Sequence, residues 1–312
     1  MVFIGIEIGG TKLQLVAGDE TGVILDRRRL AVESTAGGEG IRAQIAAALP
    51  ELIERHRPRA VAVGFGGPVD WRTGRIECSH QVAGWHGFGL GDWLRGMLPA
   101  GVPVYVDNDA NVAALGEACF GAGRGFDPVF WINMGSGIGG GLVVAGALYH
   151  GAIPGEAEIG HLRLDRDGTT LEQRCSGWAV DARIRAAAQR EPAGVLAGLT
   201  RTLQRGEARV LAAAVAAGDA QASRILAEVA EDLAFALSHA VQLFHPRVIV
   251  VGGGLSLVGE PLRGAVASVL PRFVMDSFQP GPEVRLAGLG EDSVPVGALA
   301  LAASRSRLDA GA

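Results

Sequence analysis

The sequence predicts an α/β protein built from two similar domains, and three observations lead to this expectation. The chain has 312 residues, which is about twice the length of a typical single domain. Of these residues 48% are hydrophobic, enough to bury sizeable cores. Short β-branched runs end in clusters of the 47 glycines and alternate with helical stretches, a pattern typical of largely buried sheets.

The first predicted element of each half is a β-hairpin. Residues 2–6 and 13–16 are apolar runs on either side of a glycine pair, and residues 129–132 and 142–144 lie on either side of a longer glycine loop. Apolar runs separated by glycine turns are the usual sequence signal for hairpins. Each half is therefore expected to contribute two neighbouring strands to a sheet.

A helix–strand–glycine unit then occurs in both halves. Residues 58–64 and 246–252 each follow a helical stretch, begin with Pro-Arg and end at a glycine turn. We interpret this as a duplicated architecture with one copy per domain, although chance resemblance between glycine-rich strands would give the same pattern. Two such domains would face each other with their glycine turns on opposite walls of one cleft.

The predicted domain limits divide the chain unequally. We place an N-terminal domain at residues 1–118 and a C-terminal domain at 119–295, with a terminal helix at 296–312 joined to the first domain. Between residues 207 and 243 the spacing is helical, and the Gly-Asp pair at 218–219 predicts a break into two helices.

Composition argues against several classes of protein. A net charge of −5 is unusual for a nucleic-acid-binding protein. Cys78, Cys119 and Cys175 form no CxxC pair, so neither a disulfide framework nor a cysteine zinc site is indicated. The chain enters a strand pattern at once and has no apolar run of roughly 20 residues. We therefore expect a cytoplasmic protein without a secretion signal or a membrane span.

Two glycine-rich turns are candidate phosphate sites. In Glu7-Ile8-Gly9-Gly10-Thr11-Lys12 the glycines let backbone N–H groups approach an anion, and Thr11 and Lys12 add donors. An ordinary tight turn would need only the two glycines. The loop Gly135-Ser136-Gly137-Ile138-Gly139-Gly140-Gly141 satisfies GxGxxG, but a strand follows it where a dinucleotide site needs a helix. A hairpin phosphate loop is therefore favoured there.

A third glycine cluster, Gly252-Gly253-Gly254, follows a strongly apolar strand. A turn without side chains can lie flat against an adenine or a ribose, because the ligand can approach the backbone closely. A strand-to-helix turn selected for packing explains the same residues equally well. Both interpretations stay open from the sequence.

The polar run Asp107-Asn108-Asp109-Ala110-Asn111 is the candidate catalytic segment. It follows a strand expected at 102–106 and precedes a helical pattern at 112–120. Ligands bind at the carboxyl ends of strands in α/β proteins, and phosphoryl transfer needs a carboxylate that accepts the proton of the attacking hydroxyl. A helix N-cap would explain one of these side chains, but not four polar residues in five positions.

A second polar segment, Glu156-Ala157-Glu158-Ile159-Gly160-His161, brings two carboxylates and an imidazole within six residues. Such groups can receive sugar hydroxyls. Glutamates and single histidines are also common as structural residues, so this segment by itself does not decide between the two roles.

Taken together and in order, these residues resemble the ROK family (repressors, open reading frames and sugar kinases) of the actin-like, hexokinase-like ATPases. The resemblance spans nearly the whole chain and rests on six segments: Gly9 to Lys12, Gly66-Gly67-Pro68, Asn108 to Asn111, Gly135 to Gly141, Glu158 to His161 and Gly252 to Gly254. It implies two similar actin-like (ribonuclease H-like) ATPase domains around a central cleft.

The resemblance also implies roles for individual residues. Asp109 is similar to the catalytic base. The implied sugar contacts are Gly66, Asn108, Glu158, His161 and Asp181. The implied ATP-binding residues are Gly9, Gly10, Thr11, Lys12, Gly135, Ser136, Gly137, Gly253 and Gly254. ATP and Mg²⁺ are the implied cofactors, with Glu7 near the magnesium ion directly or through water, and a homodimer is the implied assembly.

Three positions depart from the family pattern. Glu7 stands where aspartate is usual, and its longer side chain moves the charge. The stretch Leu171 to Trp178 contains only Cys175, where many members carry a zinc cluster, and with His161 it cannot complete a tetrahedral site. We therefore predict no zinc site. In the same stretch Asp181 stands where the zinc-free branch has a glutamate, so it is a shortened sugar contact at best. The third departure is Ser79-His80-Gln81, which precedes Gly84-Trp85 where an asparagine is more usual, so a different sugar preference is open.

The activity that the resemblance implies is ATP-dependent phosphorylation of a hexose, glucose or an N-acetylhexosamine, at the 6-hydroxyl. One alternative is a sugar-sensing regulator of the same family, which would carry an added N-terminal DNA-binding domain. This chain begins at the first phosphate strand, so we do not expect one. Another alternative is an ATP- and sugar-binding protein that has lost catalysis, and the intact Asn108-Asp109 pair argues against it. Polyphosphate as donor stays open, and no nucleic-acid or membrane partner is expected.

Overall fold

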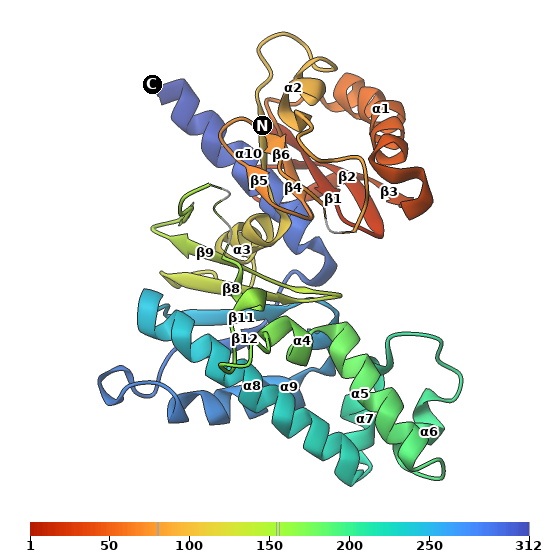
Figure 1. Ribbon diagram of the computed structural model, residues 1–312. Coiled ribbons are helices and arrows are strands. Elements are labelled where there is room, and N and C mark those ends of the chain that lie inside the picture. Colours follow the sequence, from red (N-terminus) through yellow and green to blue (C-terminus); the bar gives the residue numbers. More distant parts are fainter. Residues whose placement is uncertain (80, 154, 156, 312) are drawn as a thin grey trace. The chain divides into compact units, whose positions relative to one another are not determined.

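The computed structural model describes residues 1–79, 81–153, 155 and 157–311 (Figure 1). The chain forms two compact units, named here the first unit and the second unit. The first unit comprises Met1–Gly125, Gly141–Ala157 and Gly288–Ala312, and the second comprises Phe126–Gly140 and Glu158–Ala287. The domain limits expected from the sequence place residues 141–157 in the C-terminal domain, whereas the structure places them in the first unit.

The first sheet has five strands in the order β3-β2-β1-β4-β7. These strands are β1 (Val2–Ile8), β2 (Lys12–Asp19), β3 (Ile24–Ala31), β4 (Val61–Phe65) and β7 (Val104–Asn108). β2 pairs antiparallel with both β1 and β3, whereas β1, β4 and β7 run parallel. The predicted hairpin and the later strand that ends in glycine are therefore both present and adjacent.

Four helices belong to this unit: α1 (Gly37–His56), α2 (Leu90–Arg95), α3 (Asp109–Phe120) and α10 (Ser293–Gly311). Shorter elements are η1 (Ser34–Ala36), β5 (Val69–Asp70), β6 (Arg75–Ile76) and η7 (Gly290–Asp292). Strand side chains such as Ile6 and Val63 share one buried cluster with Ile45 of α1 and Leu94 of α2. Side chains alternate across a strand, so these two helices cover one face of the sheet.

α3 and α10 pack closely against each other on the opposite face. An added Cβ at Gly5 of β1 would lie 3.1 Å from the Cβ of Ala298 in α10, and one at Gly297 would overlap the carbonyl oxygen of Val112 in α3. Only glycine allows two backbones to approach so closely. The helix that begins at Asp109 is therefore held between the sheet and α10.

The second sheet repeats the pattern of the first, with strand order β10-β9-β8-β11-β12. Its strands are β8 (Val129–Met134), β9 (Ile138–Val144), β10 (Ala147–Leu148), β11 (Val248–Gly252) and β12 (Glu283–Leu286). β9 and β10 are antiparallel, and β8, β11 and β12 run parallel. The predicted α/β class with duplicated architecture is confirmed.

The second unit carries six α-helices in its described residues: α4 (Leu171–Cys175), α5 (Gly177–Arg190), α6 (Val195–Thr200), α7 (Leu211–Ala216), α8 (Ala220–Phe244) and α9 (Glu260–Val269). Its 3₁₀ turns are η2 (Ile159–His161), η3 (Glu207–Val210), η4 (Gly254–Val258), η5 (Leu270–Arg272) and η6 (Asp276–Phe278). The predicted helix break is confirmed, because Asp219 caps α8 by accepting the Ala222 N–H at 2.8 Å.

Two boundaries differ from the prediction. β7 runs to Asn108 and α3 begins at Asp109, so the polar segment is divided between a strand and a helix without a loop. α10 begins at Ser293, three residues before the expected start. Pro295 lies in its first turn, where proline is tolerated because the early N–H groups have no partner within the helix.

No single helix among the described residues is long and apolar enough to cross a membrane. The segments Glu207–Ala216 and Ala220–Phe244 reach the necessary length and composition only when taken together, and they are bent by 115° at the break.

Candidate active site

Three parallel strands of the first unit end side by side. The register aligns Ile8 of β1 with Phe65 of β4, and Phe65 with Asn108 of β7. The residues that follow each of them therefore meet at one edge of the sheet. The Gly66 N–H donates to the Ile8 carbonyl at 2.8 Å, which fixes the chain after β4 against β1. This edge is where ligands bind in α/β proteins.

Asp109 lies at this edge as the first residue of α3. An ideal Cβ on Gly66 would be 3.4 Å from Oδ2 of Asp109 and 3.6 Å from Cα of Gly9. The cap of α3 is Asn108, whose Oδ1 accepts the N–H of Ala110 at 2.8 Å. The helix-cap explanation of the polar run thus applies to Asn108, and the Asp109 carboxylate lies beside Gly66.

Asn108 also ties β7 to the loop after β4. Its Nδ2 donates to the Gly67 carbonyl at 3.1 Å, while Oδ1 accepts a second, longer bond of 3.3 Å from the Asn111 N–H. An amide nitrogen carries two hydrogens. Within the described residues the structure gives this one a single acceptor, so one N–H is left for a ligand.

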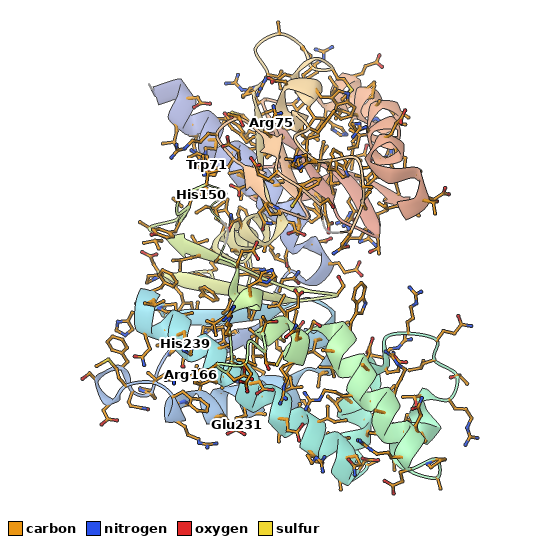
Figure 2. The ribbon with its side chains drawn as sticks, viewed as in Figure 1. Trp71, Arg75, His150, Arg166, Glu231 and His239 are labelled. Atoms are coloured by element: carbon orange, nitrogen blue, oxygen red, sulfur yellow. The ribbon has the colours of Figure 1, made fainter. Side chains whose placement is uncertain are left out.

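Asp107 forms a buried network beneath this edge. Its Oδ1 accepts the Asn108 N–H at 2.8 Å and Nδ2 of Asn111 at 3.0 Å. Its Oδ2 lies 2.7 Å from Nε2 of His150, a residue that the sequence did not single out. Figure 2 shows His150 beside Trp71 in this part of the chain. The sequence around His150 could not indicate this contact, because Asp107 is 43 positions away in the chain.

Glu7 of β1 is mostly buried and has two protein partners. Lys12 Nζ lies 3.3 Å from its Oε1, and Nε2 of Gln14 donates to its Oε2 at 2.7 Å. Burial raises the pKa of Glu7 above its ordinary value, and the neighbouring Lys12 charge opposes this rise. Both oxygens of Glu7 already have donors, so this carboxylate fits an outer contact to a magnesium ion better than a direct ligand.

The first glycine turn closes the β1–β2 hairpin. The Gly9 N–H donates to the Lys12 carbonyl at 2.9 Å, and Thr11 is exposed at the tip. An added Cβ at Gly10 would overlap the side chain of Gln81, which is flexible at its end. Gly9 and Gly10 are partly exposed, and whether the turn holds phosphate stays a prediction.

The second glycine turn joins β8 to β9 and has a partner that the sequence did not reveal. Oε2 of Glu172 in α4 accepts the Ile138 N–H at 2.7 Å, and a Cβ on Gly137 would lie 2.6 Å from the same oxygen. Gly137 is therefore needed for this contact, whatever binds nearby. By contrast, a Cβ on Gly135 would meet only ordinary contacts, 3.8 Å from Asn133.

In the triple-glycine turn after β11, Gly253 and Gly254 differ in whether the fold requires glycine. Gly253 has φ +80°, and its Cβ would lie 2.5 Å from the carbonyl carbon of Met134, so the fold itself demands glycine there. A Cβ on Gly254 would find open space within 4 Å. The packing explanation thus holds for Gly253 but gives no reason for Gly254.

Glu158 and His161 lie at the two ends of the turn η2. Glu158 precedes η2, and its carbonyl accepts the His161 N–H at 3.1 Å. An added Cβ on Gly160 between them would overlap the Ile138 carbonyl, so this turn packs directly on β9. The other carboxylate of the segment, Glu156, lies outside the described residues.

Asp181 has a structural role in the second unit. It is buried in α5, where Oδ1 accepts the Ala208 N–H at 2.6 Å and Oδ2 accepts the Gly206 N–H at 3.2 Å. Both oxygens are used to hold the chain around η3. The contact between Asp181 and a sugar that the resemblance implies stays a prediction.

The possible metal ligands of the chain are its His, Cys, Asp and Glu side chains. Across the described residues no group of three or more His, Cys, Asp or Glu side chains is arranged to hold an ion. Cys175 is fully buried, and its thiol donates to the Val229 carbonyl at 3.7 Å. Burial raises the pKa of this thiol to about 12, which keeps it in the protonated form that binds zinc poorly. The absence of zinc stays a prediction.

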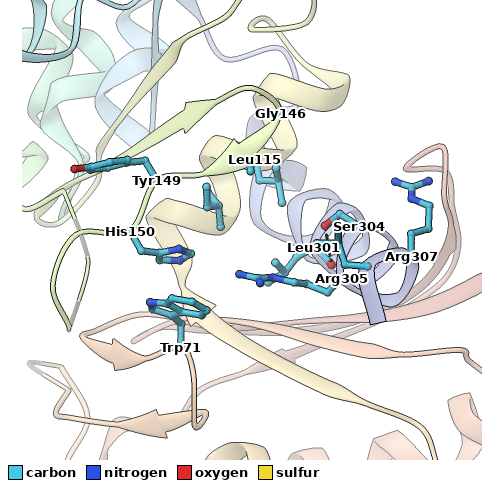
Figure 3. A pocket seen from close by; sticks show the side chains of 12 residues that line it. Trp71, Leu115, Gly146, Tyr149, His150, Leu301, Ser304, Arg305 and Arg307 are labelled. Carbon is cyan, nitrogen blue, oxygen red and sulfur yellow. Dashed lines mark hydrogen bonds between the residues drawn. The ribbon is translucent and has the colours of Figure 1, made fainter. Parts of the chain in front are cut away.

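A cavity of the first unit lies beside His150 (Figure 3). It has a volume of about 600 Å³ and is lined by Trp71, His150, Leu301, Arg305 and others. None of the residues predicted to bind sugar or ATP lines it. Its importance for the site comes through His150, which contacts Asp107.

The chain is similar to several known proteins over its full length. The ROK family model matches residues 3–305. A glucokinase of Thermotoga maritima is 31% identical over 97% of each chain, and a glucokinase of Streptomyces coelicolor is 32% identical over 96% of each chain. The crystal structure of a ROK family glucokinase from Streptomyces griseus in complex with glucose and AMPPNP is 32% identical, with a TM-score of 0.83. That match covers 97% of this chain and 100% of the other.

Proposed function

The chain belongs to the ROK family and is a sugar kinase, and we propose that it transfers the γ-phosphoryl group of ATP to the 6-hydroxyl of an aldohexose, with Asp109 as general base. The observation that carries this proposal is the position of Asp109. Its carboxylate lies at the edge where β1, β4 and β7 end, beside Gly66, while Asn108 serves as the helix cap. Asp109 is thus not required as the cap of α3.

The chemical step needs a proton acceptor, a phosphoryl donor and charge neutralisation. The hydroxyl oxygen forms a bond to the γ-phosphorus as the bond from that phosphorus to the bridging oxygen of ADP breaks, and the hydroxyl proton passes to Asp109. A magnesium ion bound with the nucleotide would offset charge on the phosphates. Glu7 is the carboxylate we assign to the neighbourhood of that ion, and Lys12 holds it in place.

Sugar binding is assigned to residues at two places in the chain. Asn108 has one amide N–H left for a hydroxyl, and Gly66 exposes backbone beside Asp109. Glu158 and His161 flank a tight turn and offer a carboxylate and an imidazole. Asp181 is given a lesser place in this proposal, since its two oxygens also accept the N–H groups of Gly206 and Ala208.

ATP binding is assigned to the three glycine turns. Gly9, Gly10, Thr11 and Lys12 offer backbone and side-chain donors, and Gly135, Ser136 and Gly137 form the matching turn of the second sheet. Gly253 and Gly254 would lie against the adenosine. The AMPPNP complex of the Streptomyces griseus relative supports a nucleotide donor, since AMPPNP is an analogue of ATP.

Glucose is the sugar we propose, on the strength of the relatives named as glucokinases and of the glucose complex. N-acetylhexosamines are the second candidate, because N-acetylglucosamine differs from glucose only in the group at carbon 2. The regulator and inactive-protein alternatives both predict that no ADP is formed when sugar and ATP are supplied together.

A coupled assay for ADP release tests the proposal. It should be run with ATP and magnesium over a panel of glucose, N-acetylglucosamine, N-acetylmannosamine, mannose, allose and fructose, with polyphosphate as an alternative donor followed by sugar-phosphate detection. We expect glucose to give the highest kcat/KM and a product phosphorylated at the 6-hydroxyl. Absence of turnover with every sugar and both donors would contradict the proposal.

A further inference from the structure

His150 and Asp107 form a buried pair next to the candidate base. Nε2 of His150 lies 2.7 Å from Oδ2 of Asp107, and the two side chains are only 7% and 4% exposed. A carboxylate oxygen accepts hydrogen bonds, so Nε2 carries the hydrogen and donates. The two residues are 43 positions apart, which means that the pair joins the segment after β10 to the end of β7.

The ring of His150 is held from its other side by packing. Trp71 stacks on it with ring centroids 4.4 Å apart and an angle of 21° between the planes (Figure 3). The guanidinium of Arg305 lies 5.1 Å from the Trp71 ring centroid. The indole N–H of Trp71 is buried and has no acceptor in the described part of the chain, so its contribution here is packing. Backbone bonding also fixes the loop, because the Tyr149 N–H donates to the Leu142 carbonyl at 2.8 Å.

Asp107 transmits this restraint to the catalytic segment. While Oδ2 is held by His150, Oδ1 accepts the Asn108 N–H at 2.8 Å and Nδ2 of Asn111 at 3.0 Å. These two contacts orient both the cap and the first turn of α3, in which Asp109 is the first residue. Without His150, the buried Oδ2 would lose its donor, and the carboxylate would turn to find another.

We infer that His150 is a positioning residue for phosphoryl transfer, which orients Asn108 and Asp109 through Asp107. This inference rests on the proposed role of Asp109. Misplacement of a reacting group by about 1 Å can cost on the order of 100-fold in rate. Loss of the His150 imidazole should therefore lower kcat by about 10- to 100-fold while the KM for ATP changes little, because the residues assigned to ATP take no part in the hydrogen bonds that Asp107 makes.

The cavity beside the pair provides an additional test. His150 and Trp71 line a solvent-connected space of about 600 Å³, so truncation of His150 to alanine would open a path for a small molecule toward Asp107. Added imidazole can then donate the missing hydrogen bond. Saturable recovery of kcat by imidazole would show that the ring acts through this bond, whereas a general packing role would not respond to it.

A matched control is available in the same unit. His56 of α1 pairs with Asp26 of β3 at 3.2 Å, and this partner holds the pKa of Asp26 at about 2. This pair is also a histidine and an aspartate, although Asp26 pairs with Arg28 and Arg55 as well, and it takes no part in the hydrogen bonds of Asp107. His56→Ala should lower thermal stability without lowering kcat, and imidazole should not change its rate.

The experiment compares the wild type, His150→Ala, His150→Gln and His56→Ala in the ADP-release assay, with and without imidazole. We expect a kcat defect in His150→Ala that imidazole relieves and that His150→Gln shows in weaker form, since the glutamine amide also donates. Wild-type kcat in folded His150→Ala would overturn the inference, as would a kcat defect in His150→Ala that imidazole does not relieve. If His150→Ala fails to fold, near-complete loss of kcat in folded His150→Gln would overturn it as well. An inactive wild type would instead contradict the proposed function.

Discussion

Adjacent residues at the end of β7 have different partners. Asn108 bonds to Ala110, Asn111 and Gly67, so its amide is largely engaged by the fold. Asp109 directs its carboxylate toward Gly66. A change at Asn108 should therefore alter stability and activity together, whereas a change at Asp109 should act on the chemical step. The sequence indicated a functional pair here but not this division.

Gly254 offers the cleanest test of the nucleotide assignment at the residue scale. A Cβ there meets nothing within 4 Å, so Gly254→Val should fold normally and yet weaken ATP binding if adenosine lies against this turn. Isothermal titration calorimetry with ATP measures the effect, and we expect a loss of about tenfold or more, since close backbone approach is lost.

The control for this variant is Gly198→Val, because Gly198 also has open space and lies in α6 of the same unit. It should bind ATP as the wild type does. Gly253→Val is unsuitable, since its Cβ would meet the backbone at Met134 and damage the fold. Normal ATP affinity in folded Gly254→Val would argue against the adenosine assignment.

The register of the strands and the packing of the helices determine where the residues of the candidate site lie. The strand ends Ile8, Phe65 and Asn108 lie in one row, which sets Asp109 next to Gly66. The sequence predicted these strands and their glycine ends because both signals are local. It could not supply Glu172 on the second turn or His150 against Asp107, since such contacts join residues 34 and 43 positions apart.

The close packing of helix α10 on helix α3 can be tested by a substitution at their contact. An added Cβ on Gly297 would overlap the Val112 carbonyl, so Gly297→Ala should lower the free energy of unfolding by about 1–3 kcal/mol through overpacking. Urea unfolding measures the change. Because α3 begins with Asp109, kcat should fall as well.

Gly264→Ala in α9 is the matched control for this effect. Its Cβ would lie 3.4 Å from the flexible end of Glu260, so alanine should fit and stabilise the helix by about 0.5–1 kcal/mol. The two variants are thus expected to change stability in opposite directions. Equal stability of Gly297→Ala and the wild type would show that α3 and α10 can separate without cost.

At the scale of the whole molecule, the sequence predicted the duplicated arrangement of the two sheets. It predicted the residues of the candidate site only in part. Both sheets place a hairpin beside parallel strands, as the paired glycine clusters predicted. The resemblance to the ROK family named Asp109, Asn108 and the glycine turns. It also named Asp181, whose oxygens accept the N–H groups of Gly206 and Ala208, contacts that the sequence did not indicate.

The central claim, that Asp109 accepts the proton of the sugar hydroxyl, is tested most directly by the turnover of Asp109→Asn. Asparagine keeps the size of the side chain but not the proton acceptor, so sugar and ATP should bind while kcat falls at least about 100-fold. Asp107→Asn is no neutral control, because Asp107 belongs to the His150 network. Asp219→Asn, at the cap of α8, should keep wild-type kcat, since asparagine caps helices as well as aspartate. Near-wild-type kcat in Asp109→Asn would contradict the account.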